Sequence, residues 1–176
     1  MSFSSPSVID SGSTSLESHL RTRPLVFSTV PFCQEDRNAM RAFVEQHASD
    51  PAERLPRTFD FLEASVRDKQ FHGCIFVSAA GEHKDTVNPV FHAAVMHKRL
   101  TIAYFEELAH AARFAEPKRI GTEINLLHEG AMAVAQMTRI AEPVRQAKRM
   151  AGQLLAAEER SSSARGGDAS QRTRAS

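Results

Sequence analysis

Four X-Pro pairs divide this chain into helix-length segments and constrain its fold more than any other feature. The pairs are Asp50-Pro51, Asn88-Pro89, Glu116-Pro117 and Glu142-Pro143. Proline fits the first position of a helix, where its missing N–H costs nothing, and Asp and Asn are favoured caps just before it. Each pair therefore predicts the start of a helix. Pro56 complicates the first of these helices, because an interior proline removes a backbone hydrogen bond. The helix either bends there or begins near Pro56.

The apolar residues around these starts follow a helical period. They recur at intervals of three and four residues, which places them on one face of each helix. They are Met40, Phe43, Val44; Leu55, Phe59, Leu62, Val66; Phe91, Val95, Ile102, Phe105, Ala109; Ile120, Ile124, Leu127, Ala131, Val134; and Val144, Ala147, Ala151, Leu154, Leu155. Gly130-Ala131 is small enough to allow close approach of another backbone. The sequence predicts an all-α bundle of five to six helices.

One segment, residues 74–80, has the composition of a strand. It is rich in β-branched and aromatic residues and lies between Gly73 and Gly81. Periodicity alone does not separate a short buried strand from a short buried helix. Only residues 25–30 offer a second strand-like run, so a short buried helix is favoured.

The two ends of the chain differ in composition from its middle. Residues 1–34 are rich in Ser and contain Pro24 and Pro31, and residues 159–176 contain no aliphatic side chain larger than Ala. Such segments bury too little apolar surface to offset the entropy of ordering. We expect an irregular or disordered leader over 1–34, a helical domain over 35–158 and a disordered tail over 159–176.

Charge and cysteine content exclude several classes of protein. Twenty-two Lys and Arg residues against 21 Asp and Glu residues give a net charge of +1, which is poor support for a nucleic-acid binder. Two distant cysteines, Cys33 and Cys74, do not form a disulfide framework and indicate reduced thiols in the cytoplasm. No apolar run reaches the roughly 18 residues of a membrane span, and the N-terminus lacks the pattern of a signal peptide.

No arrangement of residues points to catalysis or to a metal. Cys74 lies near His72 and His83, but nothing in the sequence places a cation or an oriented base beside the thiol. His92 and His97 are five residues apart, and His128-Glu129 lacks the second histidine of H-E-x-x-H. The sequence therefore predicts no catalytic residue, no metal site and no cofactor. A small helical enzyme that uses Cys74 or the histidines remains the alternative.

Three segments together resemble the C-terminal domain of TetR-type transcriptional regulators. The chain reads GCIFVSAAGEH from Gly73, an HK pair at His97-Lys98, and LLHEGAMAVAQM from Leu126. A large subgroup of that family carries a GC-x-F-x-x-A-x-x-E stretch, then an HK pair, then L-x-DGA-x-x-x-AQ. Glu82 stands at the acidic position of the first motif, and Glu129 replaces the usual Asp of the third. The resemblance covers about residues 35–158.

The family's DNA-reading helix-turn-helix has no counterpart before Glu35. Its signature is an amphipathic helix, a turn with Gly, and a recognition helix ending in a Tyr-x-x-Phe-like motif, whereas the single tyrosine here is Tyr104. The chain thus resembles a regulator without its DNA-binding half, and we expect no specific DNA binding from it. A non-functional remnant of a truncated regulator is a further alternative.

The resemblance also implies an effector pocket and a dimer. Members of the family enclose a small apolar effector between the central helices, and the last two helices pair with those of a second subunit. The candidate ligand-binding residues are Phe59, Leu62, Phe76, Phe91, Val95, Ile102, Leu127 and Met132. The candidate dimer-interface residues are Ile124, Ala131, Val134, Val144, Ala147, Ala151, Leu154 and Leu155. We expect a homodimer, or a heterodimer with an intact TetR-like regulator, and no membrane association.

The pocket candidates and two polar features can also be explained by the structure of the domain alone. Each candidate ligand-binding residue also fits ordinary packing in the core. A carboxylate in apolar surroundings needs a partner, so Glu82 is expected to interact with Lys98, Arg99 or a helix N-terminus. A structural ion pair is favoured over a ligand anchor. His97-Lys98 predicts polar contacts at a helix end or at the rim of the pocket.

Overall fold

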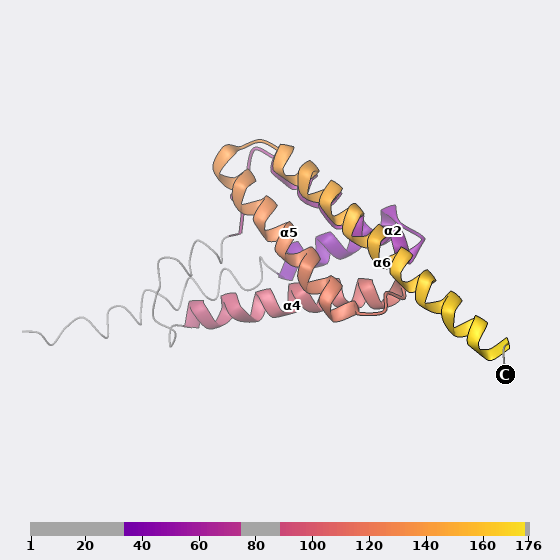
Figure 1. Cartoon of the computed structure of the whole chain (residues 1–176). Coiled ribbons are helices and arrows are strands. Elements are labelled where there is room, and N and C mark those ends of the chain that lie inside the picture. Colours follow the sequence, from indigo (N-terminus) through magenta and orange to yellow (C-terminus); the bar gives the residue numbers. More distant parts are fainter. Residues whose placement is uncertain (1–33, 75–88, 175–176) are drawn as a thin grey trace, which may run out of the picture.

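Five helices make up the described part of the chain. The computed structural model describes residues 34–74 and 89–174. A helix over residues 34–47 precedes α2 (Pro51–Arg67), α4 (Pro89–Ala111), α5 (Pro117–Thr138) and α6 (Glu142–Arg174) (Figure 1). No strand occurs within these ranges. The predicted all-α bundle is confirmed. None of the described helices is long and apolar enough to cross a membrane.

The start of α2 follows from its cap. Asp50 has an extended backbone, and its side chain accepts a hydrogen bond of 3.0 Å from the N–H of Ala52. This bond satisfies one of the N–H groups that a helix leaves unpaired at its first turn. Pro51 occupies the first helical position, and Pro56 lies inside the helix. The alternative in which the helix begins near Pro56 is therefore wrong.

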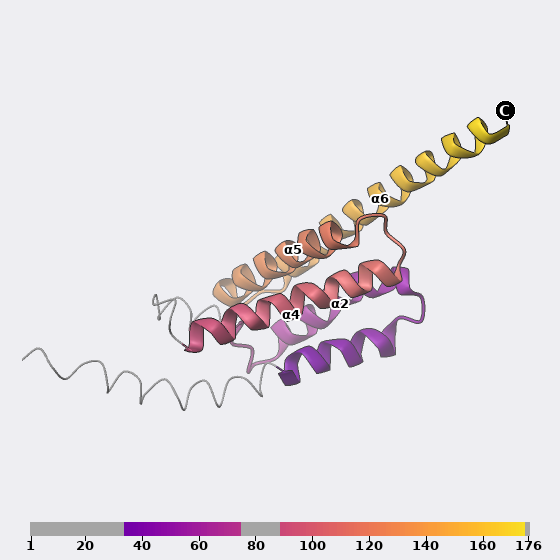
Figure 2. The ribbon, with the colours of Figure 1, turned by 90° about the horizontal axis from the view of Figure 1, so that it is seen from below.

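Helix α5 lies between α4 and α6, and α2 packs across all three. Figure 2 shows the helix over residues 34–47 beside α2, at the edge of the bundle. The core between the helices is apolar and closed to solvent. Its largest fully buried side chains include Val44, Leu55, Phe59, Phe105, Ile120, Ile124 and Val144. Burial of these residues supplies the main driving force for the fold.

Close packing of α4 against α5 depends on Gly121. A Cβ atom at this position would lie 2.6 Å from the backbone nitrogen of Glu106 on α4. Only glycine lets the two helices approach this closely. The close approach predicted at Gly130-Ala131 is not made within the described chain, because Gly130 is exposed and a Cβ atom placed there would have no neighbouring atom within 4 Å.

The ends of α4 and α6 differ from those that the sequence predicts. Helix α4 ends at Ala111, a few residues before the break expected at Glu116-Pro117. Helix α6 continues to Arg174, whereas the composition of residues 159–176 predicts a disordered tail, and the end of α6 extends beyond the bundle (Figure 1). Extending a formed helix adds one hydrogen bond per residue fixed, which composition does not reveal. Residues 1–33 of the leader predicted over 1–34, and residues 75–80 of the strand-like segment, lie outside the described residues.

Candidate functional site

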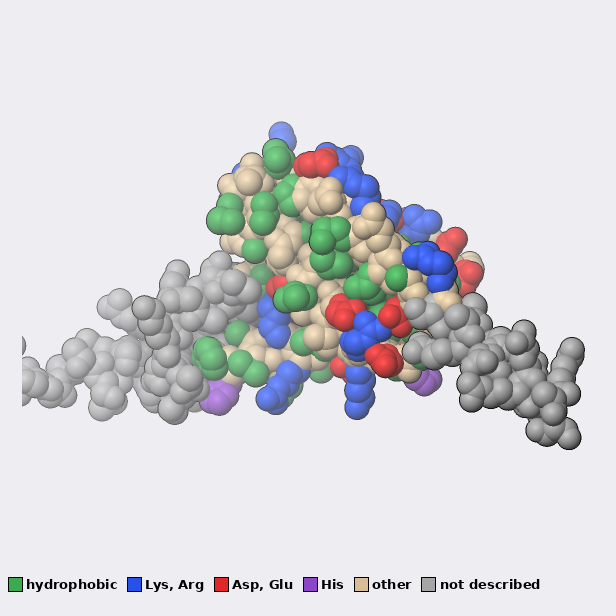
Figure 3. All heavy atoms as spheres, in the orientation of Figure 1, with side chains coloured by type: hydrophobic (Ala, Val, Ile, Leu, Met, Phe, Trp, Pro, Cys, Tyr) green, Lys and Arg blue, Asp and Glu red, His purple; other side chains and the backbone are tan. Residues whose placement is uncertain are grey.

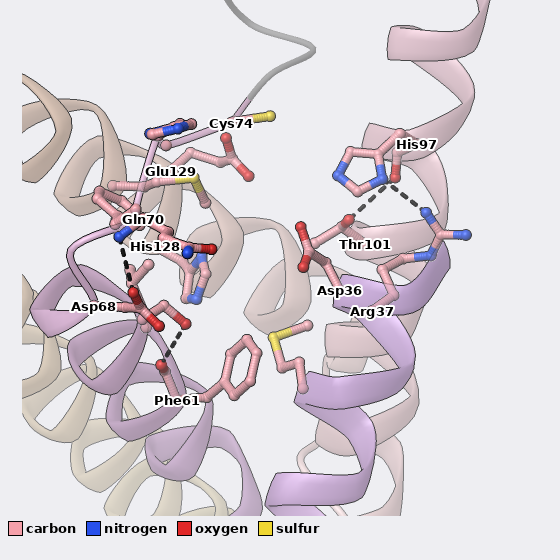
Figure 4. A pocket seen from close by; sticks show the side chains of 17 residues that line it. Asp36, Arg37, Phe61, Asp68, Gln70, Cys74, His97, Thr101, His128 and Glu129 are labelled. Carbon is pink, nitrogen blue, oxygen red and sulfur yellow. Dashed lines mark hydrogen bonds between the residues drawn. The ribbon is translucent and has the colours of Figure 1, made fainter. Parts of the chain in front are cut away.

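A cavity of about 360 Å³ opens between the helix over 34–47, the end of α2, α4 and α5. In Figure 4, Asp36, Arg37, His97 and Thr101 lie on one side of the space, and Asp68, Gln70, Cys74, His128 and Glu129 lie on the other. The volume falls in the range typical of small-molecule sites, about 300–1,000 Å³.

The cavity wall combines apolar side chains with several titratable groups. Its apolar members are Met40, Phe61, Leu62, Phe71, Cys74 and Met132. Its titratable polar members are Asp36, Arg37, Asp68, His72, His97, His128 and Glu129. A wall of this kind buries the body of an organic ligand and orients it through a few polar contacts.

His128 is the most deeply buried polar group of this wall, with 4% of its surface exposed. Its ring lies 5.5 Å from that of Phe59 and 5.4 Å from that of Phe105, measured between ring centroids. Within the described part of the chain, neither ring nitrogen has a hydrogen-bond partner in good geometry, and the backbone of Thr58 is the polar group that the ring approaches. Burial lowers the pKa of His128 to about 4, against a smaller opposing effect from this weak hydrogen bond with Thr58. The imidazole is therefore neutral at physiological pH.

His97 on α4 connects the cavity to the helix over 34–47. Its Nδ1 lies 2.7 Å from a guanidinium nitrogen of Arg37. Burial lowers the pKa of His97 to about 4, and the nearby charges of Lys98 and Arg37 act in the same direction. A neutral His97 accepts a hydrogen bond from Arg37. This is a polar contact of the kind expected for His97, whose side chain lines the cavity.

Lys98 bridges α4 and α5 at the edge of the site. Its ammonium group pairs with Glu129 and also lies 3.5 Å from the Sγ of Cys74. The partner predicted for Lys98, Glu82, lies outside the described residues, as does His83. Cys74 therefore contacts a lysine on α4, and Glu129 is held by a charge rather than left unpaired at the wall.

The segment from Asp68 to Cys74 forms one wall and is held by the end of α5. Gly73 has a φ of +71°, and a Cβ at this position would overlap the side chain of Gln136. The side chain of Arg139 donates a hydrogen bond to the carbonyl of Phe71. Only glycine meets both demands at position 73, a left-handed backbone and close contact with Gln136.

The described fold matches a known structure. A TetR-family transcriptional regulator from Streptomyces coelicolor aligns with a TM-score of 0.65 and 20% sequence identity, over 76% of this chain and 71% of that protein. The fold is TetR-like. No protein-family model and no curated protein matches the sequence.

Seven of the eight predicted ligand-binding residues are described in this TetR-like fold, and they divide into three groups. Leu62 and Met132 line the cavity. Phe59 is fully buried behind it, against His128. The partly buried residues outside the lining are Phe91, Val95, Ile102 and Leu127. Phe76 lies outside the described residues. Their roles in binding remain predictions.

The predicted dimer residues mostly face inward. Six of the eight are buried in the core of the chain itself: Ile124, Ala131, Val144, Ala147, Ala151 and Leu155. These six side chains pack within the chain itself, and their role in pairing stays a prediction. Val134 is 40% exposed, and Leu154 is partly buried. Apolar periodicity predicts that one face of a helix is buried. It does not predict whether that face is buried by the same chain or by a second subunit.

A different face of α5 and α6 is apolar and exposed. We define the outer apolar face as five exposed large hydrophobic residues: Leu126, Val134 and Met137 of α5, Ile140 of the connection that follows, and Met150 of α6. Leu126 and Met137 are 74% and 77% exposed. Figure 3 shows green side chains gathered over these helices. Gly130 lies between Leu126 and Val134, one helical turn from each.

Several residues of the cavity carry no clear signal in the sequence. His128 stands out there only as part of an incomplete zinc motif, and no pattern distinguishes Arg37, Phe61 or Phe71. A signal for His128 is nevertheless present, because it follows the buried Ile124 by four residues and so shares its inward face. Among the residues described, no group of three His, Cys, Asp or Glu side chains is placed to hold a metal ion.

Proposed function

We propose that this chain is the effector-sensing and dimerisation part of a TetR-type transcriptional regulator. The observation that carries the proposal is the cavity of about 360 Å³ inside a TetR-like helical bundle. The resemblance of residues 35–158 to the C-terminal domain of such regulators supports the same function. In this proposal the cavity takes a small, largely apolar effector.

The proposal places ligand binding and pairing on opposite faces of α5. His128 and Met132 face the cavity, whereas Leu126 and Met137 belong to the outer apolar face. A patch of exposed apolar side chains on a soluble protein marks an interaction site. The occupant we propose for the outer apolar face is a second copy of this chain, or the equivalent helices of an intact relative.

The proposed ligand cavity is tested by filling it. We expect the neutral fluorescent probe N-phenyl-1-naphthylamine to bind the wild-type chain saturably. Met132→Trp adds bulk to the cavity wall and should weaken binding at least about tenfold, because the larger ring occupies the volume the probe needs. Fluorescence titration measures the dissociation constants.

The matched control is Met96→Trp, which introduces the same ring at a side chain that is 55% exposed on α4 and does not line the cavity. This variant should bind the probe as the wild type does. Equal affinity for the probe in the Met132→Trp variant and the wild type would show that the cavity is not the binding site.

DNA recognition is not part of the proposed role of this chain. We expect no specific complex with promoter DNA at physiological salt, and a gel-shift assay measures it. A specific retarded band would contradict this part of the proposal and leave effector binding to be judged separately.

A further inference from the structure

His128 presents an unusual combination of burial and unused hydrogen-bonding capacity. It is 4% exposed, stands between the rings of Phe59 and Phe105, and neither of its nitrogens has a hydrogen-bond partner in good geometry within the described residues. Burying a polar group without a partner costs about 1–3 kcal/mol, and most buried polar side chains in proteins avoid that cost. A neutral imidazole carries one donor and one acceptor, and neither is matched in good geometry here, since the backbone of Thr58 makes only a weak contact with the ring.

The position of His128 indicates where its partner would come from. The side chain belongs to the wall of the cavity, and Figure 4 shows its ring beside the open space, across from Thr101. Thr101 is 5% exposed, and its hydroxyl donates to the carbonyl of His97 at 3.1 Å. The proton of Thr101 is therefore used, and only acceptor capacity remains on that oxygen.

The charges of the wall narrow the choice of ligand. Three carboxylates, of Asp36, Asp68 and Glu129, line the cavity with the guanidinium of Arg37, and Glu129 is already paired with Lys98. The two remaining carboxylates outnumber the guanidinium, and this balance disfavours an anion. Asp36 and Asp68 are exposed, so a cation would find its partners at the rim, whereas the depth around His128 is aromatic and apolar. Moving a charge to that depth without a partner is costly.

We infer that the cavity binds a neutral, mostly apolar molecule that carries a hydroxyl group, with this hydroxyl hydrogen-bonded to the imidazole of His128. The inference rests on the proposed function, because it names the chemistry of the effector for the same cavity. A hydroxyl can pair with the ring nitrogen of His128 that faces the cavity in either tautomer, because it both donates and accepts. An alcohol or phenol with one or two rings fits the space, which exceeds the ~150 Å³ of a dry cavity that holds benzene.

Four probes of one shape test the inference on the full chain. They are 4-butylphenol, butylbenzene, 4-butylbenzoate and 4-butylbenzylamine, compared by isothermal titration calorimetry at pH 7.5. We expect 4-butylphenol to bind about tenfold more tightly than butylbenzene, since its hydroxyl gains a hydrogen bond and relieves a buried unpaired group. The two charged probes should bind more weakly than 4-butylphenol.

The variant His128→Phe should remove this preference while keeping a ring between Phe59 and Phe105. In this variant 4-butylphenol and butylbenzene should bind with equal affinity. The matched control is His110→Phe, the same substitution at an exposed site on α4 outside the cavity, which should retain the wild-type preference.

A second measurement needs no variant. In the wild-type chain labelled with ¹⁵N-histidine, the ring nitrogen shifts of His128 should move on addition of 4-butylphenol and stay nearly unchanged with butylbenzene. This readout applies even where the His128→Phe variant does not fold.

The outcomes separate the two proposals. Equal binding of 4-butylphenol and butylbenzene, tighter binding of a charged probe, or an unchanged preference in His128→Phe overturns the role of His128 but leaves the cavity as a ligand site. Failure of all four probes and of N-phenyl-1-naphthylamine to bind overturns the proposed effector site, and the inference with it.

Discussion

Single residues of the cavity carry consequences for stability as well as for binding. His128 is neutral in the folded chain because burial lowers its pKa to about 4, whereas an unfolded histidine titrates near 6.5. Well above pH 6.5 neither state is protonated at this residue, so it contributes no pH dependence there. Between pH 6.5 and about 4 only the unfolded state gains the proton, so stability falls as the pH falls.

We therefore expect the free energy of unfolding to decrease between pH 7 and pH 5, with roughly 2 kcal/mol of the decrease due to His128. Urea denaturation at several pH values measures it. The His128→Phe variant should show a smaller decrease over the same interval, while His97, whose pKa is also lowered, keeps its share. An identical pH dependence in variant and wild type would mean that His128 is protonated alike in both states.

At the scale of the helices, the sequence predicted where elements begin better than what they contact. The Pro pairs mark the starts of α2 and α5, and the last pair falls in the first turn of α6, because Pro and a capping residue act locally on the backbone. The contact partner of each face is a property of the folded chain. Gly121 and Gly130 illustrate this, since both are helical glycines of α5, yet only Gly121 meets another backbone.

Substitution by alanine should have opposite effects on stability at Gly121, which meets another backbone, and at Gly152, which like Gly130 meets open space. Gly121→Ala should lower the free energy of unfolding by about 1–3 kcal/mol, because its methyl group would collide with the backbone of Glu106. Gly152→Ala on α6 meets open space and should raise it by up to about 1 kcal/mol through helix propensity. Chemical denaturation at one protein concentration compares the variants. A neutral Gly121→Ala would show that α4 and α5 separate without cost.

At the scale of the whole molecule, the fold was predictable and the cavity mostly was not. The helical period and the three quoted segments sufficed for an all-α, TetR-like bundle, but only Leu62 and Met132 of the eight predicted ligand residues line the cavity. The remaining wall joins residues distant in sequence, such as Arg37 and His97, which meet only after the helix over 34–47 packs beside α4. The periodicity of apolar residues within one helix does not predict contacts between side chains of different helices.

The outer apolar face predicts the assembly of the molecule. Leu126→Glu with Met137→Glu should convert a dimer to a monomer, because two carboxylates would then face the partner's apolar surface. Size-exclusion chromatography with light scattering measures the mass. Met96→Glu, at an exposed methionine of α4, is the matched control and should leave the dimer intact. A wild-type chain that remains monomeric at high micromolar concentration would contradict the proposed pairing.

Helix α5 belongs to two equilibria at once. One side of it carries His128 and Met132 at the cavity, the opposite side carries Leu126 and Met137, and its far end holds the segment around Gly73 through Gln136. If α5 moves when an effector enters the cavity, the part of the outer apolar face that it carries moves with it. Thermodynamic linkage then requires that the factor by which an effector changes subunit affinity equals the factor by which assembly changes effector affinity.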